Sequence, residues 1–432
     1  MNTVRAVLFG AGQRGMHSYA TYALEHPEEL QFVGICEPND KIRENFRLLH
    51  GIAPEMSFET WEHFFDRGYD AGVDAVFICT QDDMHFEPAV KALELGYHVQ
   101  LEKPMSNSPD KCFVLGEIAK QHKKVFTICH VLRYTDFFGT IKGLLDEGKI
   151  GQLISIQHNE NVAYWHQAHS YVRGNWRNSE MSSPMILAKS SHDLDILLWL
   201  AGSDCTKLSS FGGLTHFKAE NAPPGATKRC LDGCAVADTC PYFAPKIYID
   251  WKDSWQGSVL RAVVCREDSD EAVMKALETG PYGRCVYHCD NNVVDHQVVN
   301  MEFANEVTAS FTMCAFTKNE SRTLKLMGTK GELRANMEKN EIELSWFGVN
   351  ETETIVIDAA AKGHGGGDHG IVRDFVRQIR EGSQQQSLTA AHNSVQSHLM
   401  AFAAEQSRLT NSVVIMEDYR EKLRSETVRQ PV

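Results

Sequence analysis

The chain opens on Val4-Arg5-Ala6-Val7-Leu8-Phe9-Gly10-Ala11-Gly12-Gln13-Arg14-Gly15, in which an apolar strand leads directly into the pattern Gly-x-Gly-x-x-Gly. The first glycine allows a tight turn, the second lets the backbone approach a pyrophosphate, and the third lets the next helix pack on the strand. The helix N-terminus then offers free N–H groups and a partial positive charge. This stretch predicts a dinucleotide site to which the loop residues Gln13 and Arg14 also contribute.

A second apolar strand, Leu30 to Cys36, ends in Glu37, which lies 22 residues after Gly15. An acid at this distance is placed to bind a ribose hydroxyl group. No arginine follows Glu37 directly, which favours NAD over NADP, although Lys41 and Arg43 leave NADP open. The alternative is a glycine-rich turn in an unrelated α/β domain.

Composition limits the class of protein. The chain has 432 residues, 43% of them hydrophobic and 23% charged, which predicts a globular protein of two domains. A net charge of −14 argues against nucleic acid or an anionic membrane as partner, and no apolar run is long enough to span a bilayer. A cytoplasmic enzyme is expected, with no signal peptide, and its twelve cysteines should be reduced or bound to metal.

The two halves of the chain differ in pattern. Residues 1–130 alternate strands and helices, as in a parallel, doubly wound domain, and the strands are expected at Val4–Phe9, Leu30–Cys36, Ala75–Thr80, His98–Leu101 and Val125–Cys129. Residues 131–432 contain runs typical of an antiparallel sheet covered on one face, at Leu153–His158, Val298–Phe303, Glu306–Met313, Thr323–Met327 and Glu341–Phe347. Residues from about 211 to 290 form an irregular, cysteine-containing insertion, and helices follow at Ile371–Glu381 and Ser387–Leu409.

Several of these features together resemble the Gfo/Idh/MocA (glucose–fructose oxidoreductase / inositol dehydrogenase) family. The resemblance is carried by the glycine loop, Ile78 to His85, Glu102-Lys103-Pro104, Gly148 to Gly151 and His192-Asp193-Leu194-Asp195. It implies a Rossmann domain, a C-terminal α/β domain with an open, mainly antiparallel sheet, NAD(P), a carbohydrate substrate and a homo-oligomer, either dimer or tetramer. The residues expected to bind the cofactor are Gly10, Gly12, Gln13, Arg14, Gly15, Glu37, Thr80, His85, Glu102 and Lys103.

Lys103 and His192 are the candidate catalytic residues. Lys103 ends a strand at the edge where open α/β sheets bind ligands, so it can polarise a substrate oxygen and share its proton. His192 stands at a helix N-terminus, which favours its neutral form and its use as a base, and Asp195 could orient the ring. The alternatives are a surface lysine on a loop and a histidine that only caps a helix.

One position departs from the family pattern. Dehydrogenases of the family commonly carry an aspartate four residues before the histidine, and this chain has Ala188 there, followed by Lys189. Lys189 either supplies a different proton relay, or holds an acidic substrate, or is an ordinary lysine before a helix cap.

Polar and aromatic residues elsewhere suit a sugar ring, or a carboxylate or sulfonate on one. For the segment from Tyr164 to Arg177, the alternative is a polar loop with scattered core aromatics. For His364, the alternative is a plain helix-entry loop capped by Asp368. The residues expected to contact substrate are His130, Arg133, Trp176, Arg177, Lys189, Asp195 and His364.

Three cysteines of the insertion, Cys230, Cys234 and Cys240, fall within eleven residues. With Cys289 as the fourth ligand, or Cys285 or His288 in its place, they could form a structural zinc site. The spacing is not that of common zinc modules. An iron–sulfur cluster, reduced cysteines packed as small apolar groups and a disulfide are the alternatives.

Together these features predict an NAD-dependent oxidoreductase that acts on a secondary hydroxyl of a sugar, cyclitol or sugar-acid derivative. The first alternative is a redox-neutral NAD-dependent glycosidase or lyase that oxidises a ring carbon transiently and then eliminates. The second is a cofactor-dependent sensor or scaffold without turnover.

Overall fold

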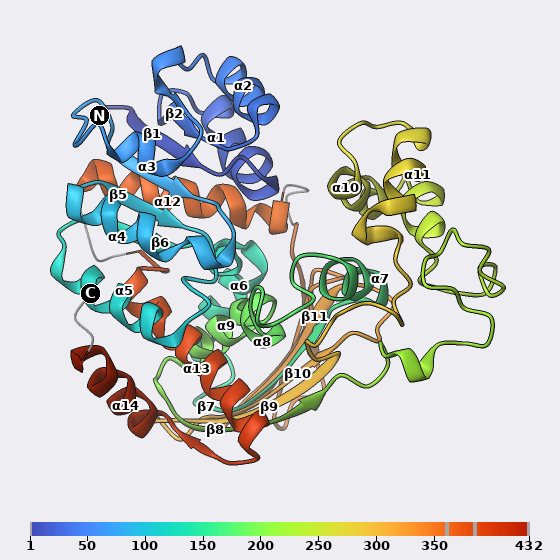
Figure 1. Cartoon of the computed structure of the whole chain (residues 1–432). Helices are drawn as coiled ribbons and strands as arrows, with labels where there is room; N and C mark the ends of the chain where they lie inside the picture. The colour runs from blue at the N-terminus through green and yellow to red at the C-terminus, as the bar shows by residue number, and fades with distance from the viewer. Residues whose placement is uncertain (1, 359–362, 383–386, 430–432) are drawn as a thin grey trace.

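The computed structural model describes residues 2–358, 363–382 and 387–429 and contains two separate sheets (Figure 1). The N-terminal sheet lies at the top of Figure 1, the larger second sheet lies below it, and an insertion of long loops and two helices, α10 (Trp255–Val264) and α11 (Asp270–Thr279), extends to the right. None of the described helices is long and apolar enough to cross a bilayer.

The N-terminal sheet is six-stranded and parallel, in the order β3-β2-β1-β4-β5-β6. Its strands are β1 (Val4–Phe9), β2 (Leu30–Cys36), β3 (Ser57–Phe58), β4 (Ala75–Ile78), β5 (His98–Leu101) and β6 (Phe126–Ile128). The central strand β1 is buried on both faces, with Leu8 and Phe9 fully covered, which is why it reads as a nearly continuous apolar run. The predicted Rossmann domain is confirmed.

The helices of this domain come from two distant parts of the sequence. Those from the N-terminal part are α1 (Ala20–Glu25), α2 (Asp40–Leu49), α3 (Trp61–Phe65), α4 (Phe86–Leu95) and α5 (Pro109–Gln121). Helix α12 (Gly367–Glu381) also belongs to this layer, because its Phe375 ring packs edge-on against Phe77 of β4, with the ring centroids 5.4 Å apart. A segment far along the chain therefore completes the core of the first domain.

The second sheet has nine strands in the order β14-β13-β12-β11-β7-β10-β9-β8-β15. They are β7 (Leu153–Asn161), β8 (Cys205–Gly213), β9 (His296–Phe303), β10 (Thr308–Cys314), β11 (Ser321–Gly328), β12 (Gly331–Asn336), β13 (Glu341–Trp346), β14 (Thr352–Val356) and β15 (Val414–Ile415). The sheet is mixed rather than purely antiparallel, since β7 and β10 run parallel. His158 and Glu160 of β7 lie on the face covered by helices, while Gln157 and Asn159 lie on the opposite face.

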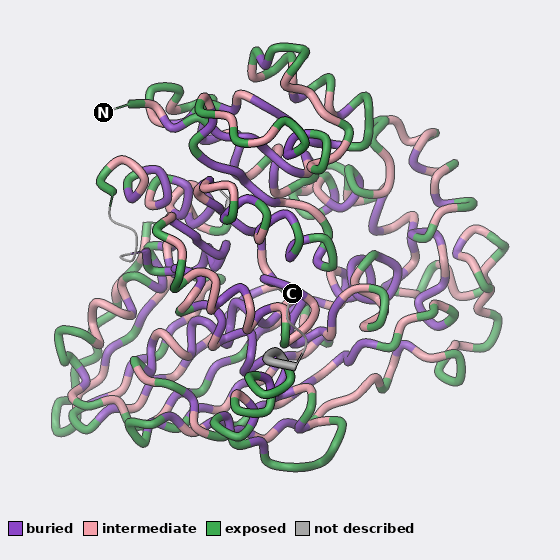
Figure 2. Tube along the Cα trace, turned by 60° about the vertical axis from the view of Figure 1, so that its left-hand side comes forward, coloured by how far each residue is buried: buried purple, intermediate pink, exposed green. Residues whose placement is uncertain are grey.

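The remaining helices either cover this sheet or form the insertion. They are α6 (Asp136–Asp146), α7 (Tyr164–His166), α8 (Met185–Ala188), α9 (Ser191–Ala201), α10 (Trp255–Val264), α11 (Asp270–Thr279), α13 (Ala391–Thr410) and α14 (Met416–Arg429). The insertion, predicted to be irregular, contains α10 and α11, which pack in a small hydrophobic cluster separate from the two main cores. In Figure 2 many of the exposed residues lie at the rim of the molecule, and the strands of the N-terminal sheet are mainly buried, whereas those of the second sheet alternate buried and more exposed residues.

Candidate active site

The glycine loop after β1 has the backbone geometry that its sequence predicts. Gly10 has a φ of +85°, and a Cβ atom there would lie 2.7 Å from the carbonyl oxygen of Cys79. A Cβ atom at Gly15 would lie 2.3 Å from the carbonyl oxygen of Gly10, so the helix could not pack this closely with a larger residue. At Gly12, by contrast, no atom lies within 4 Å of an added Cβ. The loop therefore leaves its backbone open at the position where a pyrophosphate would approach.

Glu37 lies at the carboxyl end of β2, beside this loop. Its carboxylate accepts hydrogen bonds from the backbone N–H groups of Ala11, at 2.9 Å, and Asn39, at 3.0 Å. The guanidinium group of Arg43 donates to the Glu37 carbonyl oxygen and pairs with Asp40. The acid is thus fixed next to the glycine loop, as a ribose-binding carboxylate would have to be.

Arg14 joins three segments that are far apart in the sequence. Its guanidinium group binds Glu102 at 2.7 Å and Asp368 at 2.8 Å, and it stacks on the Tyr19 ring at 4.7 Å from the centroid. His364 lies 3.3 Å from the same guanidinium group. The glycine loop, the Glu102-Lys103 turn and the start of α12 therefore meet here, and Tyr19 is a member of the site that the sequence alone did not assign to it.

His85 and Thr80 hold the turn that carries Lys103. The His85 ring nitrogens lie 2.6 Å from the carbonyl oxygen of Pro104 and 3.2 Å from that of Thr80. The peptide bond between Lys103 and Pro104 is cis. Since His85 is buried and both of its nitrogens face protein carbonyl groups, its side chain supports the loop rather than facing solvent.

Lys103 points from the end of β5 toward the second domain. Its Nζ atom donates a hydrogen bond to the carbonyl oxygen of Ala188 at 2.6 Å. Burial lowers the pKa of Lys103 below its usual value, although the carboxylates of Glu102 and Asp82 act in the opposite direction. An ammonium group has three donors, and only one of them is used by Ala188.

His192 lies in the first turn of α9, four residues after Ala188. It is 8% exposed, and its Nδ1 atom has no hydrogen-bond partner among the described residues. Burial, together with the positive charge of Lys103, lowers the pKa of His192 well below its usual value. The ring is therefore neutral and can accept a proton. Its neighbours are His130, with ring centroids 5.8 Å apart, and His364, at 6.3 Å.

Three residues expected at the substrate are buried behind His192. The Arg133 guanidinium group binds both carboxylate oxygens of Asp195, at 2.6 and 2.7 Å, and the His130 ring lies 3.9 Å from the same carboxylate. Asp195 does not bind the His192 ring, because its hydrogen bonds go to Arg133. The pair supports the start of α9 from inside the protein.

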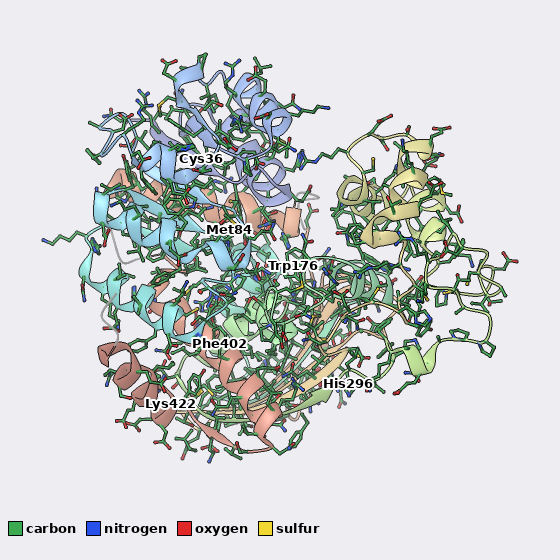
Figure 3. All side chains as sticks on the ribbon, in the orientation of Figure 1. Cys36, Met84, Trp176, His296, Phe402 and Lys422 are labelled. Atoms are coloured by element: carbon green, nitrogen blue, oxygen red, sulfur yellow. The ribbon has the colours of Figure 1, made fainter. Side chains whose placement is uncertain are left out.

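Trp176 and Arg177 are neighbours in sequence but make contacts in different places. The Trp176 indole N–H donates to Asp82 at 3.4 Å, which connects the second domain to the loop after β4, and Figure 3 shows this residue near the middle of the molecule. Arg177 instead pairs with Asp290 of the insertion at 2.8 Å. Only Trp176 is brought toward Lys103 by this arrangement.

A buried ionic network beside Lys189 was not predicted. It links β7, β11, α9 and the loop before β11 through His158, Asp193, Arg322, Glu160, Lys189, Glu320 and His166. Glu160 and Arg322 are paired in the β7–β11 register, and both side chains lie on the covered face of the sheet. The only signal in the sequence was a charged residue at a covered position of each strand, which cannot be recognised before the sheet is assembled.

The cysteines of the insertion form a cluster without a metal site. Four thiols, those of Cys230, Cys234, Cys240 and Cys285, line a cavity of about 10 Å³, whereas the Cys289 thiol lies 3.3 Å from the Cys285 carbonyl oxygen. The Cys230 sulfur accepts from the Ala244 N–H at 3.4 Å. All twelve cysteines are free. The zinc site predicted at Cys230, Cys234, Cys240 and Cys289 is not supported, since in the described part of the chain no group of three or more His, Cys, Asp or Glu is placed to hold a metal ion.

Comparisons with known proteins match both halves of the chain. Residues 4–130 match the oxidoreductase family with an NAD-binding Rossmann fold, Gfo/Idh/MocA, and residues 142–407 match the C-terminal alpha/beta domain of that family. The putative oxidoreductase YteT of Bacillus subtilis (strain 168) is 25% identical over 70% of this chain and 72% of its own length.

Two further proteins are similar over different lengths. The 2,7-anhydro-N-acetylneuraminate hydratase of Mediterraneibacter gnavus is 27% identical over 51% of this chain and 55% of its own length. A levoglucosan dehydrogenase, solved in complex with NADH and levoglucosan, superposes over 96% of this chain and 100% of that one, with a TM-score of 0.71 and 17% identity. The latter likeness concerns the fold.

Proposed function

The chain belongs to the Gfo/Idh/MocA oxidoreductase family, and from this premise we propose that it is an NAD-dependent dehydrogenase acting on a secondary hydroxyl of a sugar, cyclitol or sugar-acid derivative. One observation carries the proposal. A buried lysine, Lys103, lies at the carboxyl end of the parallel sheet and binds the Ala188 carbonyl oxygen, four residues before the neutral histidine His192, on which its charge acts. Open α/β sheets bind their ligands at this edge.

The two side chains have complementary roles in the oxidation. Bound NAD⁺ supplies the acceptor for the hydride that leaves the carbinol carbon. The Lys103 ammonium group donates a hydrogen bond to the substrate oxygen and stabilises the negative charge that develops there as the O–H proton leaves. His192 accepts that proton, since its ring is neutral and its Nδ1 atom has no partner in the described structure.

The preference for NAD over NADP is supported by the surroundings of Glu37. A carboxylate at this position repels a 2′-phosphate, and Arg43, which could have bound such a phosphate, is already paired with Asp40. Lys41, the other cation for which the sequence left NADP open, is exposed.

The test is the absorbance of reduced nicotinamide while the purified protein and NAD⁺ meet a panel of sugars, cyclitols, sugar acids and glycosides. Continuous formation of NADH with one compound is the expected result. Replacing NAD⁺ by NADP⁺ should lower kcat/KM by at least about tenfold. A panel on which no compound is oxidised or otherwise converted would remove the proposal.

A second candidate function is a redox-neutral reaction, in which the ring carbon is oxidised, a neighbouring bond is eliminated, and the hydride returns. The similarity of 51% of this chain to the hydratase of Mediterraneibacter gnavus supports this second candidate. The same assay separates the two candidates. A burst of NADH limited to the enzyme concentration, with substrate still being converted, would establish the internal redox cycle.

We also propose that the chain forms a homo-oligomer through the face of the second sheet that helices leave uncovered. A polar groove of about 400 Å³ runs over this face, lined by residues such as Gln157, Asn159, Lys325 and Glu341. Light scattering coupled to size exclusion should give a dimer or tetramer mass, and charge reversal at Lys325 should shift the mass toward the monomer.

A further inference from the structure

The positive charges around Lys189 are matched by carboxylates of the protein itself. The Lys189 ammonium group lies 2.5 Å from Glu320 and 3.3 Å from Glu160. Arg322, behind it, lies 2.7 Å from Glu160 and 2.8 Å from Asp193. A cation that already has two carboxylates at contact distance has little attraction left for an acidic substrate.

The other cations of the site are matched in the same way. Arg14 holds Glu102 and Asp368, and Arg133 holds Asp195. Lys103 is the exception, because its Nζ atom binds only the Ala188 carbonyl oxygen among the described residues. Since the proposed reaction uses Lys103 at the reacting oxygen, none of the cations named above is left unpaired for a carboxylate elsewhere on the substrate.

Glu320 is the partly exposed member of the network. Its side chain is 30% exposed, whereas Glu160 is fully buried, and the His166 Nδ1 atom lies 3.2 Å from its Oε2 atom. Burial acts to raise the pKa of Glu320, but the charges of Lys189 and His166 hold the pKa well below its usual value. Glu320 is thus a fixed carboxylate with open acceptor capacity.

Glu320 is linked to Lys103 through its partner Lys189. Its partner Lys189 directly follows Ala188, the residue that accepts the Lys103 hydrogen bond. The charge of Lys103 also contributes to lowering the pKa of His166, after burial as the main cause, so the two groups share one electrostatic environment.

We propose that Glu320, held by Lys189 and His166, is a substrate-specificity residue that accepts hydrogen bonds from the hydroxyl groups of an uncharged polyol and disfavours sugar acids. This inference rests on the proposed function and narrows its substrate class. A carboxylate accepts up to four hydrogen bonds and repels another carboxylate, so neutral sugars and cyclitols gain contacts that a uronic or aldonic acid loses. The sequence left open that Lys189 holds an acidic substrate, and this inference disfavours that alternative.

The experiment compares matched pairs, each a neutral sugar or cyclitol and the sugar acid of the same configuration. Two readouts are used with the holoenzyme: kcat/KM by NADH absorbance, and the shift of the melting temperature by each compound in the presence of NADH. For the wild type we expect a preference of about 100-fold for the neutral member in kcat/KM, and a melting shift from that member alone. In Glu320→Gln, KM for the neutral member should rise about tenfold with little change in kcat, and the preference should shrink.

Three variants separate recognition from structure. Glu320→Gln leaves Lys189 paired with Glu160, so the fold should persist. Glu320→Asp keeps the charge but shortens the side chain, so it should raise KM while retaining the discrimination against acids. Glu302→Gln removes a carboxylate from a surface ion pair with Lys207, at 3.0 Å, and should change neither quantity.

The outcomes separate this inference from the proposed function. Turnover that favours the acids, or an unchanged preference in Glu320→Gln, would overturn the assignment of Glu320 and leave the dehydrogenase intact. Absence of turnover with every compound would remove the proposed function instead. The melting shift needs no chemistry, so in that case a shift by neutral members alone would still support the assignment, and shifts by the acids would still overturn it.

Discussion

The Nζ atom of Lys103 lies 2.6 Å from the carbonyl oxygen of Ala188, so the lysine at the end of β5 is anchored by the backbone just before α9. The residue that dehydrogenases of this family commonly carry at position 188 is an aspartate, and here the main chain supplies the acceptor instead. A backbone carbonyl orients the ammonium group but does not titrate. In the proposed function the proton relay therefore rests on Lys103 and His192.

Replacing the lysine tests its role in chemistry. Lys103→Met should lower kcat by about 10²–10⁴-fold, because the substrate oxygen loses its hydrogen-bond donor, while NADH binding followed by fluorescence titration should be retained. Lys142→Met, which removes a half-buried lysine of α6 paired with Asp146, is the matched control. Wild-type turnover in Lys103→Met would rule out the catalytic assignment.

The pH dependence of turnover reports on His192. Because its pKa is held well below the usual 6.5, the ring stays neutral as pH falls from 8 to 6.5, and kcat should not decrease over this range through imidazole protonation. His192→Asn should lose about 100-fold in kcat. A decrease in kcat with a midpoint near 6.5 that disappears in His192→Asn would contradict the predicted neutral state.

Cofactor affinity is predicted to depend on Glu37. In Glu37→Ala the ribose loses a charged acceptor and the Ala11 N–H loses its partner, so the dissociation constant for NADH should rise about 10- to 100-fold. Glu44→Ala removes an exposed carboxylate of α2 that pairs with Arg47, and should leave the constant unchanged. Isothermal titration calorimetry measures the NADH dissociation constant of both variants and of the wild type. A constant in Glu37→Ala equal to that of the wild type would show that Glu37 does not bind the cofactor.

The Arg133–Asp195 pair is predicted to act on stability rather than on substrate binding. Arg133→Met leaves a buried carboxylate without its partner and should lower the free energy of unfolding by about 3–5 kcal/mol. In the double variant with Asp195→Asn the loss should be smaller than the sum of the two single losses, as denaturant unfolding can measure. A rise in KM at unchanged stability would instead support the substrate contact that the sequence suggested.

Glu160 should make stability depend on pH. Burial, only partly offset by Arg322, raises its pKa from 4.5 to about 7. The folded protein then binds more protons than the unfolded chain between these values, so the contribution of this group to stability is present below about 4.5 and is lost as pH rises through about 7. Relative to the wild type, Glu160→Gln should show a smaller loss of unfolding free energy between pH 4.5 and 7. Parallel pH curves would contradict the raised pKa.

The glycine loop, Glu37 and the Glu102-Lys103-Pro104 turn could be recognised in the sequence because each is a local feature. Gly10 needs its positive φ whatever surrounds it, and the apolar run of β1 indicates a strand buried on both faces. The same holds for the position of His192 at the start of α9. Local backbone constraints and apolar patterns therefore determined the fold class, and the resemblance to the Gfo/Idh/MocA family added Lys103 and His192 as candidate catalytic residues.

Residues whose roles depend on a distant partner could not be assigned in this way. Arg133 and Asp195 were expected at the substrate, and nothing near either residue in the sequence shows that the two saturate each other. Arg177 was expected beside Trp176, yet it pairs with Asp290 of the insertion. The thiols Cys230, Cys234 and Cys240 were close in sequence, but coordination requires directions in space that spacing does not contain.

The sequence by itself determined the Rossmann domain and its glycine loop, and with the family resemblance it predicted Lys103 and His192 as the catalytic residues. Only the tertiary structure decided that α12 completes the first domain and that Glu320, 131 residues after Lys189, neutralises it. The physical reason is the range of the interactions. Backbone geometry and apolar periodicity act within a few residues, whereas the charge state of Lys189 depends on the β7–β11 register, which brings Glu160 and Arg322 together, and on the loop that carries Glu320 to the same point.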